Sequence, residues 1–353
     1  MMTARERWLS TIEGRCPDRV PCDYWGTSEV TRRLMRHLSC DSERALWECL
    51  RIDKCIFLAP KHPSAKENTW HIPSQFSVWG IPTAMVPYMD GLGFYEEAVD
   101  PPLAHAQSSS DVEHFPWPDC SEWDAGGLRT ECLRWKGYPI VGASYEPFYL
   151  YCRLRGMEQA LEDLVLGSPV VDAAMERIYE IHAGIVRRVL DAAGDLIDFI
   201  YVAEDLGTQN SLLMSPRLFR RYIKPWLAKM IELAHSRGVK AFHHDDGAIR
   251  GVLADLIEIG IDVLSPIQWR CRGMERKALV RDFGNAVAFH GGIDNQQTMP
   301  FGTPADVWNE VAANVSIFKK AKGYIVAPCH NLQANTPTAN ILALYEAVQE
   351  LSA

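Results

Sequence analysis

Eight short runs of apolar and β-branched residues recur along the chain, and each is followed by turn residues and then by a helical pattern. This alternation is typical of βα units in a parallel sheet. Eight such units predict a single (β/α)8 barrel of the TIM type, since no Gly-rich dinucleotide fingerprint follows the first run to indicate an open doubly wound sheet. The predicted strands are residues 20–25, 54–58, 138–144, 199–204, 239–244, 262–268, 287–291 and 324–329.

Two features of the connections bear on the architecture. Ser215 and Pro216 are typical of the N-cap and first turn of a helix, so we expect a helix over residues 217–237 that Gly238 ends. The long segment 59–137 interrupts the regular spacing and predicts an insertion at the barrel mouth between the second and third strands, where long loops are usually functional. Without repeats or a linker, residues 1–353 are expected to form one domain.

Composition excludes several classes of function. The chain has 36 Lys and Arg against 45 Asp and Glu, a net charge of −9, which argues against a nucleic-acid surface. No apolar run approaches the length of about 18 residues that a membrane span needs, and the first residues lack the apolar centre of a signal peptide. The ten cysteines contain no CxxC pair and are expected to be mostly reduced. We therefore expect a cytoplasmic protein with neither a nucleic-acid nor a membrane partner; the oligomeric state stays open.

Polar residues at the carboxyl ends of barrel strands are the functional candidates, because active sites of this fold lie at that face. From these positions we expect catalytic roles for Glu204, Asp205 and Asp23. Glu204 and Asp205 can serve as acid and base, as metal ligands or as partners that orient a histidine, but they can equally be solvated residues at a helix start. The expected substrate-binding residues are Trp25, Trp79, Tyr145, Gln268, His290 and Asp294.

The densest cluster of ionisable residues is residues 243–246, two histidines and two aspartates at the end of the fifth predicted strand. Alternation along a strand places His244 and Asp246 on one face. Imidazole and carboxylate both suit zinc, and the Cys329 thiolate at the end of the eighth strand can complete a mixed site. The alternatives are a helix cap at Asp246 and an ordinary buried cysteine at Cys329.

Aromatic residues in the insertion suggest a second element of the site. Trp70, Trp79, Tyr88 and Phe94 can line a pocket for an apolar or aromatic ligand, or can form a small core within the insertion itself.

Six motifs together resemble the uroporphyrinogen decarboxylase-like superfamily, from about residue 5 to the C-terminus. Within it the chain looks more like the corrinoid-linked methyltransferases, because the Arg-rich N-terminal signature of the true decarboxylases is missing. The motifs are residues 19–21 (RVP), 154–158 (LRGME), 204–207 (EDLG), 244–247 (HDDG), 290–294 (HGGID) and 327–331 (APCHN).

The methyltransferase branch typically carries a His-x-Cys-Gly element after the fifth strand and a distal Cys after the eighth, which together bind zinc. By position His244, Gly247 and Cys329 match this pattern, whereas Asp246 replaces the first Cys. A carboxylate donates less charge to the metal than a thiolate, so the resemblance implies a stronger Lewis acid that polarises a methyl donor rather than one that activates a thiol.

The resemblance thus implies a zinc methyltransferase that moves a methyl group from a small ether or amine to a corrinoid on a partner protein. A metal-independent decarboxylase or lyase is the alternative, with Asp23 or Asp205 protonating a carbanion and Arg153, Arg155 or Arg270 holding the substrate acid. A catalytically idle binding barrel is the third reading. The motifs do not identify the substrate.

Overall fold

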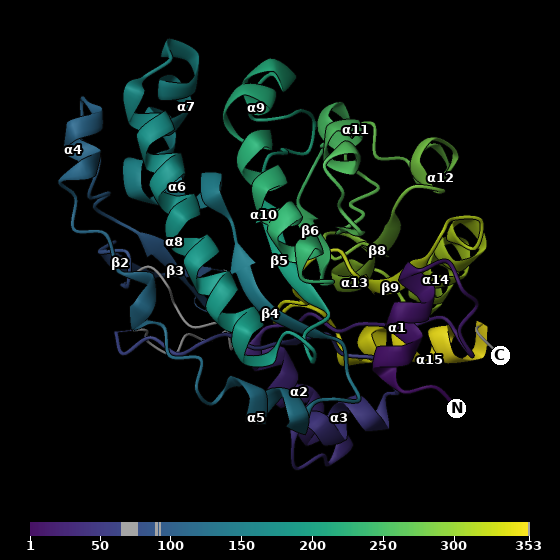
Figure 1. Cartoon of the computed structure of the whole chain (residues 1–353). Helices are drawn as coiled ribbons and strands as arrows, with labels where there is room; N and C mark the ends of the chain where they lie inside the picture. Colours follow the sequence, from purple (N-terminus) through teal and green to yellow (C-terminus); the bar gives the residue numbers. More distant parts are fainter. Residues whose placement is uncertain (65–76, 89–90, 92, 352–353) are drawn as a thin grey trace.

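The computed structural model describes residues 1–64, 77–88, 91 and 93–351, and its centre is a curled, seven-stranded parallel sheet with the order β1-β4-β5-β6-β7-β8-β9 (Figure 1). Seven of the eight predicted runs therefore form strands, in chain order around the sheet. The strands are β1 (Ile56–Phe57), β4 (Ile140–Tyr145), β5 (Phe199–Glu204), β6 (Lys240–Asp245), β7 (Val263–Ser265), β8 (Ala288–Ile293) and β9 (Tyr324–Pro328).

The first predicted strand, residues 20–25, departs from the expected barrel. It makes an isolated bridge from Cys22 to Val326 of β9, and on its other side the Asp53 N–H donates to the Cys22 carbonyl at 2.7 Å. The next donor, the N–H of Cys55, bonds to the Asp23 carboxylate at 3.0 Å instead of to a main-chain oxygen. A side chain thus replaces a rung of the ladder, and the structure has a TIM-barrel-like sheet of seven strands in place of the eight predicted.

Helices pack against the outer side of the sheet, as Figure 1 shows for α8 and α10 beside β4, β5 and β6. Within the described residues, no helix is both long and apolar enough to cross a bilayer. The helices are α1 (Ala4–Ile12), α2 (Ser28–Leu38), α3 (Glu43–Cys49), α4 (Ser109–Glu113), η2 (Cys120–Glu122), α5 (Leu128–Arg134), α6 (Pro147–Arg155), α7 (Met157–Leu166), α8 (Pro169–Ala193), α9 (Pro216–Tyr222), α10 (Lys224–Ser236), α11 (Arg250–Glu258), α12 (Arg276–Phe283), α13 (Thr298–Phe301), α14 (Pro304–Phe318) and α15 (Thr338–Leu351).

The predicted helix over residues 217–237 forms as two helices. Ser215 caps α9 by accepting from the Leu218 N–H at 3.3 Å, as expected, but α9 ends at Tyr222 and α10 begins at Lys224. Pro225 lies in the first turn of α10 and has no N–H to donate to the preceding turn, which ends the first helix there. Gly238 follows α10 with a φ of +74°, as the end of a helix favours.

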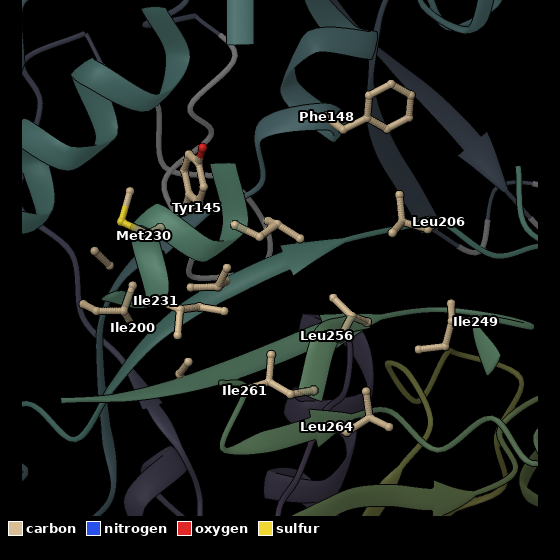
Figure 2. Packing of buried hydrophobic residues seen from close by; sticks show 14 of the residues in the cluster. Tyr145, Phe148, Ile200, Leu206, Met230, Ile231, Ile249, Leu256, Ile261 and Leu264 are labelled. Atoms are coloured by element: carbon tan, nitrogen blue, oxygen red, sulfur yellow. The ribbon is translucent and has the colours of Figure 1, made fainter. Parts of the chain in front are cut away.

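Apolar side chains form two layers, one inside the curled sheet and one between the sheet and the helices. The inner layer includes Phe199, Phe242 and Trp8 of α1. The centroid of the Trp8 indole ring lies 6.0 Å from that of each phenyl ring, so Trp8 helps to fill the interior of the sheet. In the outer layer, Ile200 of β5 lies close to Met230 and Ile231 of α10 (Figure 2). The polar strand ends lie above the inner layer, so the apolar interior forms the floor of the mouth.

The described part of the insertion includes an antiparallel pair, β2 (Thr83–Tyr88) and β3 (Gly93–Ala98), separate from the main sheet. Trp79 is buried and stacks on His182 of α8, with ring centroids 5.0 Å apart and planes at 15°. Phe94 is exposed, and Trp70 and the side chain of Tyr88 lie outside the described residues. Trp79 therefore holds the insertion on α8, as in the small-core alternative.

A buried ion cluster fixes α1 below the sheet. The carboxylate of Asp53, which is 1% exposed, pairs with the guanidinium groups of Arg7 and Arg19 and accepts from the Cys22 N–H at 3.1 Å. We predict that Asp53→Ala lowers the free energy of unfolding by about 3 kcal/mol, because Arg7 then keeps a buried charge without this partner. Urea denaturation followed by circular dichroism measures the change.

Asp195→Ala is the control, because its pair with Arg129 is exposed on both sides and should contribute little. Equal stability of the two variants would contradict a structural role for Asp53.

Candidate active site

Three ligand-type side chains converge where β5 and β6 end. The two strands pair in register, Ala203 opposite His244, so Asp205 and Asp246 leave the sheet at the same level. One donor atom from each of Asp205, His244 and Asp246 lies within 4.8 Å of the others. The His244 Nε2 is 3.7 Å from the Asp205 Oδ1 and 3.8 Å from the Asp246 Oδ1. We call these three residues the mouth triad.

His244 is held as a neutral imidazole between aromatic rings. Its ring stacks on Trp25 with centroids 6.1 Å apart and planes at 11°, and the Tyr201 ring lies 5.7 Å away. Burial lowers the pKa of His244 to about 4, so a lone pair is available at neutral pH. Its Nδ1 is buried and has no hydrogen-bond partner within the described chain. A neutral imidazole whose Nε2 faces two carboxylates is a suitable metal ligand.

Asp246 is positioned by Gln268, one of the predicted substrate-binding residues. The Gln268 amide donates to the Asp246 Oδ1 at 2.9 Å, and its oxygen accepts from the Gly247 N–H at 2.8 Å. Burial raises the pKa of the Asp246 carboxyl. His330 approaches from the loop after β9, with its Nε2 4.0 Å from the Asp246 Oδ2. Both Gln268 contacts serve to orient a triad member.

Cys329, the third predicted metal ligand, is not part of the mouth triad. Its Sγ–H donates to the Ile267 carbonyl at 3.1 Å, and burial raises the pKa of the thiol well above its usual value. The structure thus brings His244 and Asp246 together as predicted and adds Asp205 rather than the cysteine.

Asp23 and His290 form a buried hydrogen-bonded pair next to Trp25. Although burial disfavours ionisation, the Lys54 ammonium and the hydrogen bond from His290 hold the pKa of Asp23 below its usual value. The Asp23 carboxylate accepts from the Trp25 indole N–H at 2.8 Å and from the His290 Nε2 at 3.2 Å. The Ser265 hydroxyl lies 2.9 Å from the other ring nitrogen of His290. Asp23 and His290 therefore support Trp25, which in turn covers His244.

Two other predicted residues, both carboxylates, lie away from the triad. Glu204 is buried on the outer face of β5, where its carboxylate accepts from the backbone N–H groups of Phe148 and Tyr149 at the start of α6, at 2.8 and 2.9 Å. Asp294 accepts from the Thr298 N–H at 3.1 Å and pairs with Arg270 at 2.5 Å. Both carboxylates stabilise helix starts or loops in this structure.

Tyr145 faces the helices because β4 contains an irregularity. The register with β5 shifts between Val141 and Ser144, so Ser144 rather than Tyr145 pairs with the inward-facing Tyr201. The Tyr145 ring instead lies 5.3 Å from the His182 ring of α8. The same shift turns the following residue, Glu146, towards the mouth.

Glu146, which lies just after the third predicted strand, is a functional candidate to which the sequence analysis assigned no role. It lines a cavity of about 550 Å³ at the mouth, together with Phe57 and Tyr201. Burial, with repulsion from Asp205, raises the pKa of Glu146 to about 7. Its position at a strand end makes it a candidate by the same rule that selected Tyr145.

The chain is similar to known proteins. The family model described as uroporphyrinogen decarboxylase (URO-D) matches residues 128–351. A uroporphyrinogen decarboxylase from Thermus thermophilus is 26% identical over 227 residues, 61% of this chain and 60% of that protein. One from Pseudomonas aeruginosa is 24% identical over 287 residues, 77% of this chain and 76% of that protein. The chain thus spans only about 60% of the length of the Thermus relative.

A solved structure, a methyltransferase from Methanosarcina mazei, superimposes with a TM-score of 0.71 at 18% identity and covers 99% of both chains. This similarity establishes a shared fold over the whole length.

Behind the triad, His243 and Asp245 form a buried polar pair on the outer face of β6. The His243 Nδ1–H donates to the Val202 carbonyl at 2.6 Å, which leaves Nε2 as an acceptor 3.7 Å from the Asp245 Oδ2. The other carboxyl oxygen of Asp245 accepts from the Leu206 N–H at 2.8 Å. Burial raises the pKa of Asp245 well above its usual value, which favours the neutral form of this carboxyl.

We predict that Asp245→Asn keeps the free energy of unfolding within about 1 kcal/mol of the wild type, because the amide reproduces a neutral carboxyl. Asp245→Ala should cost about 1 to 3 kcal/mol, because it leaves the buried Leu206 N–H without a partner. Urea unfolding of the three proteins compares them. An Asn variant as unstable as the Ala variant would mean that Asp245 is ionised.

Proposed function

The chain belongs to the uroporphyrinogen decarboxylase family, and from this premise we propose that it is a zinc-dependent methyltransferase. It takes a methyl group from a small methylated ether or amine and transfers it to a corrinoid carried by a partner protein. The observation that carries the proposal is the mouth triad, one neutral imidazole and two carboxylates converging at the carboxyl ends of β5 and β6.

The donor set of the triad fits zinc. The His244 Nε2 faces the carboxylates of Asp205 and Asp246 at 3.7 and 3.8 Å, and a divalent cation stabilises such an arrangement. Asp205, His244 and Asp246 would hold the ion. Zinc bound there supplies Lewis acidity to the heteroatom that carries the methyl group.

The surrounding residues prepare this position. Trp25 and Tyr201 shield the His244 imidazole from solvent, and Gln268 fixes the Asp246 carboxylate. Asp23 holds the Trp25 ring in place through the indole N–H. Such outer contacts fix the orientation of ligand side chains and tune a metal site.

The decarboxylase alternative has the names of the 24–26% identical relatives in its favour. It requires arginine side chains in the mouth to bind the carboxylates of the substrate. In this chain all three candidates pair with internal carboxylates: Arg153 with Glu97 at 2.5 Å, Arg155 with Asp163 at 2.8 Å and Arg270 with Asp294 at 2.5 Å. This engagement favours the methyltransferase.

We predict about one zinc per chain by elemental analysis of protein purified without a His-tag or added metal. Zinc should be lost in His244→Ala and Asp246→Ala and reduced in Asp205→Ala, because each removes one donor of the triad. Cys329→Ser should keep the metal, because its thiol is engaged with Ile267. His37→Ala, which removes an exposed histidine on α2, is the matched control.

Methyl transfer is then measured as formation of methylcobalamin from cob(I)alamin on a corrinoid protein, with methylated amines and ethers as donors. If the wild-type protein contains no zinc, or if His244→Ala keeps its zinc, the mouth triad is not a zinc site. The decarboxylase alternative would then be favoured.

A further inference from the structure

We propose that the cavity beside the mouth triad binds a methylated ammonium group, with Glu146 as its counter-ion, which makes the substrate an amine rather than an ether. This inference rests on the proposed function and names its substrate class. The cavity, of about 550 Å³, lies at the carboxyl ends of β1, β4 and β5, and α5 of the insertion forms its outer wall. Its volume is within the usual range for small-molecule sites.

Aromatic faces form an inner corner of this cavity. The rings of Phe57 and Tyr201 meet with centroids 5.2 Å apart and planes at 76°. Perpendicular aromatic faces of this kind recognise alkylated ammonium groups, because the π electrons attract a positive charge spread over methyl groups. Tyr201 also lies next to His244, so a group against its ring is adjacent to the mouth triad.

The chain itself places an ammonium group against one of these two rings, that of Phe57. On the side of the neighbouring cavity, which Phe57 also lines, the Lys54 Nζ lies 5.9 Å from the Phe57 ring centroid and 5.6 Å from that of Trp25. Lys54 lines only that second cavity of the two, and it pairs with Asp23 at 3.6 Å. The cavity beside the triad shares the Phe57 ring with this second cavity but is not lined by Lys54.

The charge of the cavity favours a cation. Glu146 lies at its inner end, and no Lys, Arg or His of the described chain forms an ion pair with this carboxylate. At the outer rim, Glu131 pairs with Arg134 at 3.1 Å, and Asp124 accepts from the Gly126 N–H at 2.7 Å, while Lys61 is exposed. Among the described carboxylates of the lining, Glu146 is therefore the one with neither an ion pair nor a backbone donor.

A neutral ether is poorly suited to a cavity lined by a carboxylate and two aromatic rings. Its oxygen is only an acceptor and offers nothing to a carboxylate, whereas an ammonium group satisfies both the carboxylate and the aromatic faces. The cavity and the triad together thus select a methylated amine, with the cationic group in the cavity.

The test compares choline with its neutral carbon analogue, 3,3-dimethylbutan-1-ol, by isothermal titration calorimetry on the full chain, as purified and after chelator treatment. Choline keeps its charge at every pH, so binding does not depend on protonation of the ligand. We expect choline to bind at least about ten-fold more tightly than the alcohol. Glu146→Gln should remove that preference, lowering choline affinity about ten-fold and leaving alcohol affinity unchanged.

Phe57→Leu is the second variant, and it should weaken choline binding more than alcohol binding, because it keeps an apolar side chain but removes the ring. Glu180→Gln, on the exposed side of α8, is the control and should change neither affinity. Equal binding of the two ligands, no binding of either, or a choline affinity insensitive to Glu146→Gln would overturn the proposal.

Because the titration uses no corrinoid and is repeated without metal, its outcome is independent of methyl transfer. Choline selectivity without methyl transfer would refute the proposed function alone, and methyl transfer without choline selectivity would refute the ammonium site alone.

Discussion

The buried carboxylate of Asp23 is the contact on which the mouth depends. It accepts from the Cys55 N–H where an eighth strand would place a main-chain carbonyl, and so joins the N-terminal segment to β1. The same carboxylate accepts from the Trp25 indole and from His290. Because Trp25 stacks on His244, the Asp23 carboxylate both joins the N-terminal segment to the sheet and fixes the orientation of the His244 imidazole. A hydrogen bond to a main-chain carbonyl could also join the N-terminal segment to β1, but it could not orient the Trp25 side chain as the Asp23 carboxylate does.

The sequence predicted those parts of the site that regular strand geometry determines. The pairing of β6 with β5 is regular from Phe199–Lys240 to Glu204–Asp245, so alternation correctly placed His244 and Asp246 together and turned His243 and Asp245 to the other face. Seven of the eight strands follow from the same reasoning. Each of these predictions depends on local pattern and on the rule that parallel strands end at one edge.

The positions of the remaining site residues depend on three-dimensional contacts that the sequence pattern does not reveal. A single register shift in β4 exchanges the directions of Tyr145 and Glu146, and the sequence gives no sign of where it falls. Glu204 stands at a strand end as expected, but the N–H groups at the start of α6 bind its carboxylate from outside the sheet. Cys329 occupies the expected position in the chain, yet its thiol reaches the Ile267 carbonyl. Such outcomes depend on which of several near partners lies closest in three dimensions.

The mouth combines acidic side chains that the fold alone does not neutralise. Burial raises the pKa values of Asp246 and Glu146, which means that ionising either carboxylate in this environment costs free energy. Two other buried carboxylates, Asp53 and Asp163, have nearby cations, whereas Glu204 and Asp245 accept from backbone N–H groups. The absence of such pairing at Glu146 within the described residues, beside a cavity, indicates that the compensating charge comes from outside the chain. In the proposed function, a divalent ion at the triad and an organic ammonium against Phe57 and Tyr201 would satisfy these carboxylates separately, so that substrate selection and activation of the methyl group would use neighbouring but distinct residues.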